Sequence, residues 1–266
     1  MKIGFRKMKI WRIFLWMWSE SRVLIMVNCL KSQLLKQKHR FTLKLLWLGP
    51  LMPLAIAIIL MGGRYFFEAS FNWWYTLLLP ATLSILVAFT VSAEKRHNRH
   101  GLFAVSINKK DLWLSQLFML TLQLLLVNLV VWIDMTIIGL LLGLRVPIGQ
   151  ALIGSLVLFV TFAWQIPLFL FISEKTGAFF TIMLSLICNM GFGIFLAPTK
   201  LWMIPFAIPA RLMCPIIKVL PNGLPLEAGN PLGDSQVVLT GFLITVSLYF
   251  IFSFFTTSWF NKEEVN

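Results

Sequence analysis

The side chains most able to do chemistry gather in one short basic segment, Glu94–Asp111 (EKRHNRHGLFAVSINKKD). His97 and His100 stand three residues apart, but no cysteine or acidic partner completes a metal-binding set. We therefore interpret both histidines as solvated loop residues and expect no metal. The chain contains neither GxxxxGK[ST] nor HExxH, the motifs of a phosphate-binding loop and of a zinc protease. The sequence thus predicts no catalytic residue, no bound cofactor and no enzymatic activity of its own.

Asp134 is a second candidate, because it lies within the apolar run VNLVVWIDMTIIG. A charge at mid-membrane costs about 2.5–3.5 kcal/mol, so such a residue normally pairs or faces water. At about 1.5 Å per helical residue, its distance from the start of the run places it near the outer interface. Two interpretations stay open: a solvated interfacial carboxylate, or a functional residue. Asn128, Gln165 and Asn189 are instead predicted to hydrogen-bond between helices.

The overall composition predicts the class of protein to which these residues belong. Of 266 residues, 59% are hydrophobic and 12% are charged, with a net charge of +13 and a mean hydropathy of +0.84. Soluble domains carry about 25% charged residues, so a water-soluble globular enzyme is excluded. Nucleic-acid binding is disfavoured, since it needs basic side chains on a soluble surface. An apolar chain with basic loops is typical of a multi-pass membrane protein. The three cysteines form no CxxC and predict neither a disulfide framework nor a zinc site.

Six apolar runs are long enough to cross about 30 Å of hydrocarbon, which takes about 20 helical residues. The predicted transmembrane spans are 43–61, 73–93, 112–144, 151–173, 178–198 and 235–257. The third is too long for a perpendicular crossing, so it must tilt, kink or begin as an interfacial piece. The sequence therefore predicts an all-α integral membrane protein with six transmembrane helices in a domain that covers 43–257.

The basic residues predict the orientation of these spans. The gaps on one side hold five Lys and Arg, and the segments on the other side hold twelve. Because positive residues stay in the cytoplasm, both termini are predicted to be cytoplasmic, with 199–234 as an external loop and 258–266 as a cytoplasmic tail. Tryptophans fall near both predicted membrane boundaries: Trp47, Trp113 and Trp259 inside, and Trp73, Trp74 and Trp202 outside.

The N-terminal part divides into two segments. Residues 1–25 are too short and too interrupted by Arg12 to span, and no signal cleavage site follows them. Met26 is a plausible alternative start, so whether residues 1–25 belong to the working protein stays open. Residues 26–42 repeat apolar side chains at helical spacing between Lys and Arg, which predicts an amphipathic helix in the membrane interface.

Four motifs, in order along the chain, resemble one known family. They are MVNCLKSQLLKQKHRFTLKLLW at 26–47, FNWWYTLLLP at 71–80, WQIPLFLFISEKTG at 164–177, and the PNGLP turn at 221–225 within a long external segment. Together they resemble the permease subunits of lantibiotic-immunity ABC transporters, the MutE/EpiE family. The resemblance covers roughly 26–259 and leaves residues 1–25 outside.

This resemblance implies a fold, partners and an activity. The fold would be a six-span subunit of the type-2 ABC exporter kind in the bacterial cytoplasmic membrane. The partners would be a second, related permease subunit and two copies of a separate ABC ATPase subunit, which would use the ATP. The complex would remove a lantibiotic peptide from the membrane lipid and expel it, protecting the cell that makes it.

The resemblance also suggests roles for two groups of residues. An ATPase must push on a cytoplasmic element joined to the spans, and the candidates are Glu94, Lys95, Arg96, Arg99, Gly101, Leu102, Phe103 and Ile107, with Glu174 and Lys175 in a second contact. The alternative is that these are ordinary cytoplasmic charges. The candidates for a membrane-lying lid that contacts the peptide are Asp134, Trp202, Phe206, Arg211, Pro221, Asn222 and Gly223. The alternative is that the external loop merely caps the spans.

Two other functions stay open. The chain could be a type-2 ABC permease for another amphipathic cargo, such as bacitracin-like peptides, lipids or ions. It could also be an ATP-independent membrane immunity protein that sequesters the peptide. Co-purification with an ATPase separates the two transporter functions from the third.

Overall fold

The computed structural model describes residues 41–61, 63, 65–96, 108–144 and 146–262. The predicted N-terminal extension, 1–25, lies outside the described residues. So does the predicted interfacial helix, 26–42, except for its last two residues, which begin the first described helix. The regular elements in the described part are all helices, and two residues, Val219 and Pro225, form an isolated β-bridge there. The predicted all-α class is confirmed.

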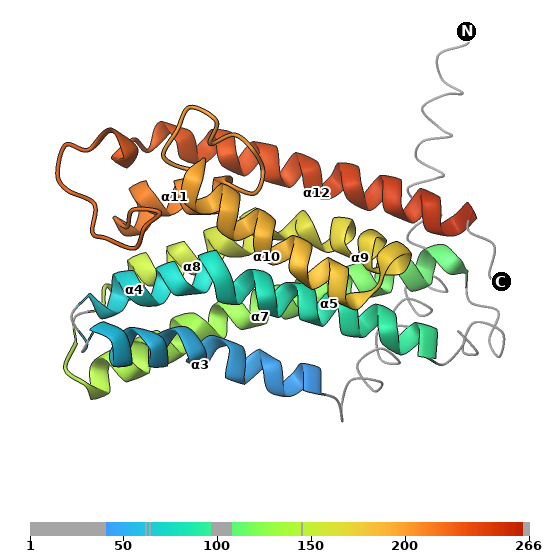
Figure 1. Ribbon diagram of the computed structural model, residues 1–266, viewed down its shortest axis with the longest axis horizontal. Helices are drawn as coiled ribbons and strands as arrows, with labels where there is room; N and C mark the ends of the chain where they lie inside the picture. Colours follow the sequence, from blue (N-terminus) through green and yellow to red (C-terminus); the bar gives the residue numbers. More distant parts are fainter. Residues whose placement is uncertain (1–40, 62, 64, 97–107, 145, 263–266) are drawn as a thin grey trace, which may run out of the picture.

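Long antiparallel helices form the body of the molecule (Figure 1). They are α3 (Phe41–Met61), α4 (Phe66–Trp73), α5 (Leu79–Arg96), α7 (Lys109–Leu141), α8 (Ile148–Ala163), α9 (Gln165–Thr176), α10 (Ala178–Phe195) and α12 (Gln236–Lys262). A π-helical turn, η1 (Trp74–Leu78), joins α4 to α5 without a break. The short helices α11 (Ile208–Ile217) and η2 (Pro231–Gly233) lie in the connection between α10 and α12.

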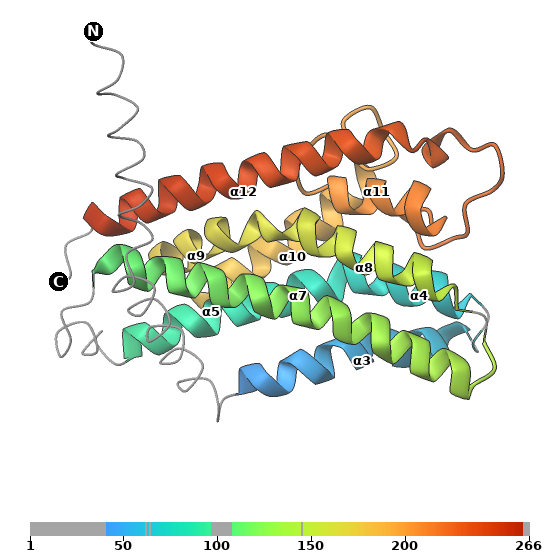
Figure 2. The same ribbon diagram turned by 180° about the vertical axis from the view of Figure 1, so that it is seen from behind.

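The bundle has two distinct ends, which both views show (Figures 1 and 2). At the terminal end, α3 begins, α5 ends, α7 begins, α9 turns into α10, and α12 ends. At the loop end, α3 ends, α4 begins, α7 turns into α8, and the 196–235 connection with α11 packs between α10 and α12. The described ends of the segment 94–111, at 94–96 and 108–111, and the segment 199–234, predicted on opposite sides of the membrane, thus lie at opposite ends of the bundle.

Several of these helices are long and apolar enough to cross a membrane. Four stretches qualify by themselves among the described residues: Phe66–Lys95, Lys109–Leu141, Ala178–Phe195 and Gln236–Lys262. The helices α8 and α9 meet at a bend of 42° and make a fifth if they are one broken span. In α3 the apolar part described is shorter, Lys44–Leu60. A multi-pass membrane protein is therefore supported, with four or five candidate spans, and the count of six stays a prediction.

The span boundaries differ from the predicted ones in two places. The second span starts at Phe66 rather than at residue 73, because α4 runs into α5 through the π-helical turn. The fourth is broken at Trp164 rather than continuous. Pro167 explains the break, since its ring has no N–H and would clash with the carbonyl of Ala163 in a regular helix. The residue then sits in the first turn of α9, where proline is tolerated.

Two tryptophans predicted at the membrane boundaries lie inside the protein instead. The side chains of Trp74 and Trp113 are fully buried. The Trp74 Nε1 donates to Asn128 Oδ1 at 3.1 Å, and the Trp113 Nε1 donates to Thr256 Oγ1 at 3.2 Å. A buried indole needs an acceptor for its N–H, and each ring finds one on another helix. These rings therefore join helices rather than anchor the molecule in the interface.

A buried pair of amides joins the bent span to α10. The Gln165 Nε2 donates to Asn189 Oδ1 at 2.8 Å, and the Asn189 Nδ2 donates back to Gln165 Oε1 at 2.9 Å. The Ser185 Oγ, one turn earlier on α10, donates to the carbonyl of Pro80 on α5. Together with the bond from Trp74 to Asn128, these contacts confirm that Asn128, Gln165 and Asn189 are hydrogen-bond partners between helices.

Breaking the amide pair on one side should destabilise the bundle. Gln165→Leu and Asn189→Leu each leave a buried amide without its partner, which should cost about 1–2 kcal/mol. The double variant leaves no unpaired amide and should recover part of the loss. The measurement is thermal unfolding of the purified protein in detergent. Met190→Leu, at an exposed position next to Asn189, is the control. Single variants that unfold at the temperature of this control would contradict the prediction.

Candidate functional site

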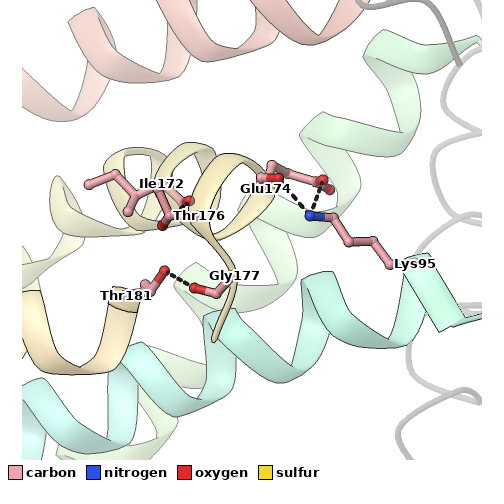
Figure 3. Close-up of polar contacts among 6 residues, drawn as sticks. All are labelled: Lys95, Ile172, Glu174, Thr176, Gly177 and Thr181. Carbon is pink, nitrogen blue, oxygen red and sulfur yellow. Dashed lines mark hydrogen bonds and ion pairs between the residues drawn. The ribbon is translucent and has the colours of Figure 1, made fainter. Parts of the chain in front are cut away.

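An ion pair links α5 to the turn between α9 and α10 at the terminal end (Figure 3). The Lys95 Nζ lies 3.4 Å from Glu174 Oε2 and donates to the Glu174 carbonyl oxygen at 2.6 Å. The Glu174 side chain is only 6% exposed, whereas that of Lys95 is 43% exposed. An ammonium group at the C-terminal turn of a helix also interacts favourably with the helix dipole. The end of α5 is thus attached to α9 through both a carboxylate and a carbonyl.

The turn that receives this contact is tight. Gly177 adopts a φ of 90°, a conformation that side chains other than glycine rarely adopt. The N–H of Gly177 donates to the Ser173 carbonyl, and this hydrogen bond closes the last turn of α9. The carbonyl of Gly177 accepts a hydrogen bond from the Thr181 Oγ1 at 2.8 Å, in the first turn of α10 (Figure 3). The two helices therefore reverse direction over one residue, and a displacement of Glu174 must carry both of them.

Aromatic side chains extend this contact to two further helices. The Lys175 Nζ lies 4.7 Å from the centroid of the Trp259 ring on α12, within reach of a cation–π interaction. The Trp259 ring packs edge-on against Phe171 of α9 and against Trp113 of α7. The ring of Phe260 stacks on Trp113 with centroids 4.5 Å apart. We call Lys95, Glu174, Lys175, Trp113 and Trp259 the terminal-end cluster.

The structure brings together the two segments that were predicted to contact the ATPase. Part of the first segment lies outside the described residues. Glu94, buried, and Lys95 end α5 beside Glu174 and Lys175, so the first predicted contact and the second form one surface. Outside the described residues lie the side chain of Arg96 and the residues Arg99, Gly101, Leu102, Phe103 and Ile107. The sequence analysis missed Trp259 as part of this surface, although its position near a predicted inner boundary was a usable signal.

The short helix α11 lies inside the protein at the loop end, so the prediction of a membrane-lying lid does not hold for it. Almost every residue of α11 is buried, and the helix packs against α8, α10 and α12. Glycines on two of these helices leave room for it. A Cβ at Gly154 would come within 2.8 Å of Ile217, and one at Gly241 would come within 3.0 Å of Ile208 and Leu212.

Three of the predicted lid residues help to hold this buried arrangement. The Arg211 Nη1 donates to the Leu232 carbonyl at 2.6 Å, and its guanidinium lies 6.0 Å from the Trp202 ring centroid. The Phe206 ring packs edge-on against Trp164, at the bend between α8 and α9. Burial raises the pKa of the Cys214 thiol, one turn after Arg211, to about 11, so this thiol stays neutral. These side chains are already engaged within the protein.

The PNGLP turn docks directly on the π-helical region of the second span. The Asn72 Nδ2 donates to the Pro221 carbonyl at 3.1 Å and to Tyr75 Oη at 2.9 Å. The Tyr75 hydroxyl in turn donates to the Leu220 carbonyl at 3.4 Å. Two of the motifs that carry the family resemblance, at 71–80 and at 221–225, therefore contact each other. We call this contact the loop-end dock.

The turn itself is closed by its own backbone. The N–H of Gly223 donates to the Leu220 carbonyl at 2.8 Å, and the N–H of Leu224 donates to the Asn222 side chain at 3.1 Å. Gly223 has a φ of +87°, and a Cβ added to it would lie 3.0 Å from the Asn72 side chain. Only glycine fits there without displacing Asn72. Pro221 and Gly223 thus face the second span, while Asn222 is exposed.

Asp134 stays apart from the other predicted lid residues. It lies within α7, and its Oδ2 is buried without a hydrogen-bond partner among the described residues. Two residues further along α7, Thr136 lines a cavity of about 630 Å³ at the loop end. Glu68 and Lys218 line the same cavity; Lys218 belongs to the predicted external loop, and Glu68 was not predicted as a site residue. We call it the loop-end cavity.

The comparisons with known proteins and the search for metal ligands add no further site. No family model, no curated protein and no solved structure matches the chain. In the described part of the chain, no three His, Cys, Asp or Glu side chains are grouped in a way that could hold a metal ion. The contacts of the candidate site join helices at the terminal end and join the Pro221 turn to the helical stretch Phe66–Lys95 at the loop-end dock.

Replacing Gly223 should open the loop-end dock. Gly223→Ala puts a Cβ at a left-handed position, which costs about 1–2 kcal/mol, and also pushes on Asn72. Gly229→Ala is a matched control, because Gly229 has a φ of +85° but open space around its Cβ position. We expect limited proteolysis within 218–235 to be faster in Gly223→Ala than in Gly229→Ala, and Asn72→Ala to remove most of that difference. Equal cleavage of the two glycine variants would contradict the dock.

Proposed function

We propose that this chain is the membrane permease subunit of an ABC exporter that protects a bacterial cell by expelling a lantibiotic from its cytoplasmic membrane. A separate ATPase hydrolyses the ATP, and a second, related permease completes the pathway. The order and spacing of four sequence motifs and the multi-pass helical architecture support this proposal. The observation that carries it is the terminal-end cluster, in which two segments separately predicted to receive the ATPase stroke contact each other.

The second span provides the path by which such a stroke would cross the membrane. Phe66–Lys95 is one helical stretch of 30 residues. Lys95 at its terminal end joins the α9–α10 turn, and Asn72 near its other end holds the Pro221 turn. At about 1.5 Å per residue these two contacts are about 35 Å apart. A push on the end of α5 would therefore reach the Pro221 turn along one continuous helical stretch, which includes the π-helical turn Trp74–Leu78.

Two irregular places in the bundle are suited to changing shape under this push. One is the π-helical turn Trp74–Leu78, directly beside the loop-end dock; single π-helical turns of this kind often occur at functional sites. The other is the bend at Trp164, which separates α8 from α9. Glu174 and Lys175 lie on α9, on the terminal side of that bend. A movement of α9 can therefore change the angle between α8 and α9 while α8 stays in place.

The peptide would be handled through apolar contact in this proposal. The external segment carries Trp202 and Leu201, of which Leu201 is 59% exposed, and its one buried arginine is engaged with Leu232. Charge gives no net attraction of a cationic peptide to this segment, because its exposed cations, Lys200 and Lys218, are balanced by two exposed carboxylates, Glu227 and Asp234. An amphipathic peptide in the outer leaflet would still present an apolar face to such a surface.

Removing the ammonium of Lys95 should uncouple ATP hydrolysis from peptide export. In the complex assembled with its ATPase and second permease, Lys95→Met should lower peptide-stimulated ATP turnover about tenfold, toward the basal rate. It should also abolish protection of cells against the lantibiotic. Lys95→Arg keeps a donor for Glu174 and should retain most of both activities. The measurements are ATP turnover with and without peptide, and survival of cells that express the complex.

Lys110→Met is the matched control, since Lys110 is an exposed cation at the same end and takes no part in the cluster. Co-purification of the ATPase with each variant shows that assembly survives. Lys95→Met with normal stimulation and normal protection would contradict coupling through this contact. A wild-type chain that protects no cell when expressed with the ATPase and second permease would contradict the function itself.

A further inference from the structure

The loop-end cavity has the size of a site for a small molecule or a headgroup. Its volume is about 630 Å³, and such sites usually have about 300–1,000 Å³. It lies where the first turn of α4, the end of α7, the start of α8 and the end of α11 converge. These elements meet at the loop end of the bundle (Figure 2).

Two opposite charges line this cavity and are not engaged elsewhere. Within the described residues, neither the Glu68 carboxylate nor the Lys218 ammonium has a hydrogen-bond or ion-pair partner, so the two do not neutralise each other. The uncharged polar side chains of the lining are already used: Thr136 donates to the Trp132 carbonyl, and Gln150 donates to the Ile216 carbonyl at 2.6 Å. Among the described residues, the lining therefore offers one anionic and one cationic group to a ligand.

A left-handed backbone conformation occurs at Lys218 itself and at Tyr65, the residue before the helix that carries Glu68. Lys218 has a φ of 58°, and Tyr65, three residues before Glu68, has a φ of 59°. They are the two non-glycine residues with a left-handed backbone in the described part of the chain. The Lys218 carbonyl accepts from the N–H of Leu226 at 2.8 Å, which fixes this conformation. Backbone strain of this kind clusters at ligand sites, where the surrounding structure maintains it.

The rim of the cavity is apolar and continues onto the outer surface. Leu140 and Ile148 line the cavity and are also largely exposed, at 69% and 45%. Leu141 and Leu142 continue this surface beyond the rim. In a membrane protein such side chains face acyl chains. A ligand that fits must therefore join an ammonium group, an anionic group and an apolar tail within one molecule.

We propose that the loop-end cavity binds the headgroup of a zwitterionic phospholipid of the outer leaflet. The ammonium group faces Glu68, the phosphate faces Lys218, and the acyl chains lie along Leu140 and Ile148. A cationic peptide fits less well, because Lys218 repels it while Glu68 attracts it. This lipid site does not depend on the proposed transport function.

The test uses the full-length chain purified in mixed micelles of phosphatidylethanolamine and phosphatidylglycerol with identical acyl chains. The phospholipids retained by the protein are then measured by mass spectrometry. We expect the wild type to retain phosphatidylethanolamine preferentially and Glu68→Gln to lower this preference about tenfold. Lys218→Gln should lower the retention of both lipids. Glu227→Gln and Lys200→Gln, exposed charges that do not line this cavity, should behave as the wild type.

Glu68→Lys separates loss of binding from loss of folding. With two cations in the cavity, this variant should reverse the preference toward phosphatidylglycerol, a change that a misfolded protein cannot produce. An unchanged preference in Glu68→Gln, or no reversal in Glu68→Lys, would overturn the proposal. Displacement of phosphatidylethanolamine from the wild type by an added cationic lantibiotic would assign the cavity to the peptide and also overturn it.

Discussion

The hydrogen bonds from Asn72 and Tyr75 to the Pro221 turn attach the 199–234 segment to the same helical stretch whose other end carries Lys95. This places two contacts on one rod and makes the second span the connection between the ends of the bundle. The dock needs Gly223, because a larger residue would displace Asn72. It also needs the π-helical turn, which carries Tyr75 toward the loop. Without this dock, the 199–234 segment would be held to the bundle mainly through the packing of α11 against α8, α10 and α12.

Several contacts between the helices arise because polar groups buried away from water need hydrogen-bond partners inside the protein. Where Pro167 breaks the fourth span, the neighbouring Gln165 has its amide satisfied by Asn189 rather than by solvent. The indoles of Trp74 and Trp113 obey the same rule with partners on other helices. Each irregular place in a span is thus accompanied by a side-chain pair that holds it, so the bend and the π-helical turn are defined features of the fold.

Much of the fold could be predicted from apolar run length and charge, and the contacts could not. The runs around 112–144 and 235–257 are long enough to predict their helices directly, and amides within spans predict pairing. The burial of α11 was missed because its apolar pattern suits lipid as well as protein, and because Gly154 and Gly241, which receive it, are remote in sequence. The meeting of Glu68 and Lys218 at one cavity was missed for a similar reason, because 150 positions of the sequence separate them. The meeting of Lys95 with Glu174 was half predicted, as two contacts rather than one.

The most direct test of this arrangement is the side of the membrane on which each end lies. Single cysteines at Asn222 and Lys110, in a chain whose three native cysteines are replaced by serine, report on the loop end and the terminal end. A membrane-impermeant maleimide applied to intact cells should label Asn222→Cys and leave Lys110→Cys unlabelled until the cells are permeabilised. Labelling of both positions in intact cells, or of Lys110→Cys alone, would contradict a second span that carries displacement across the membrane.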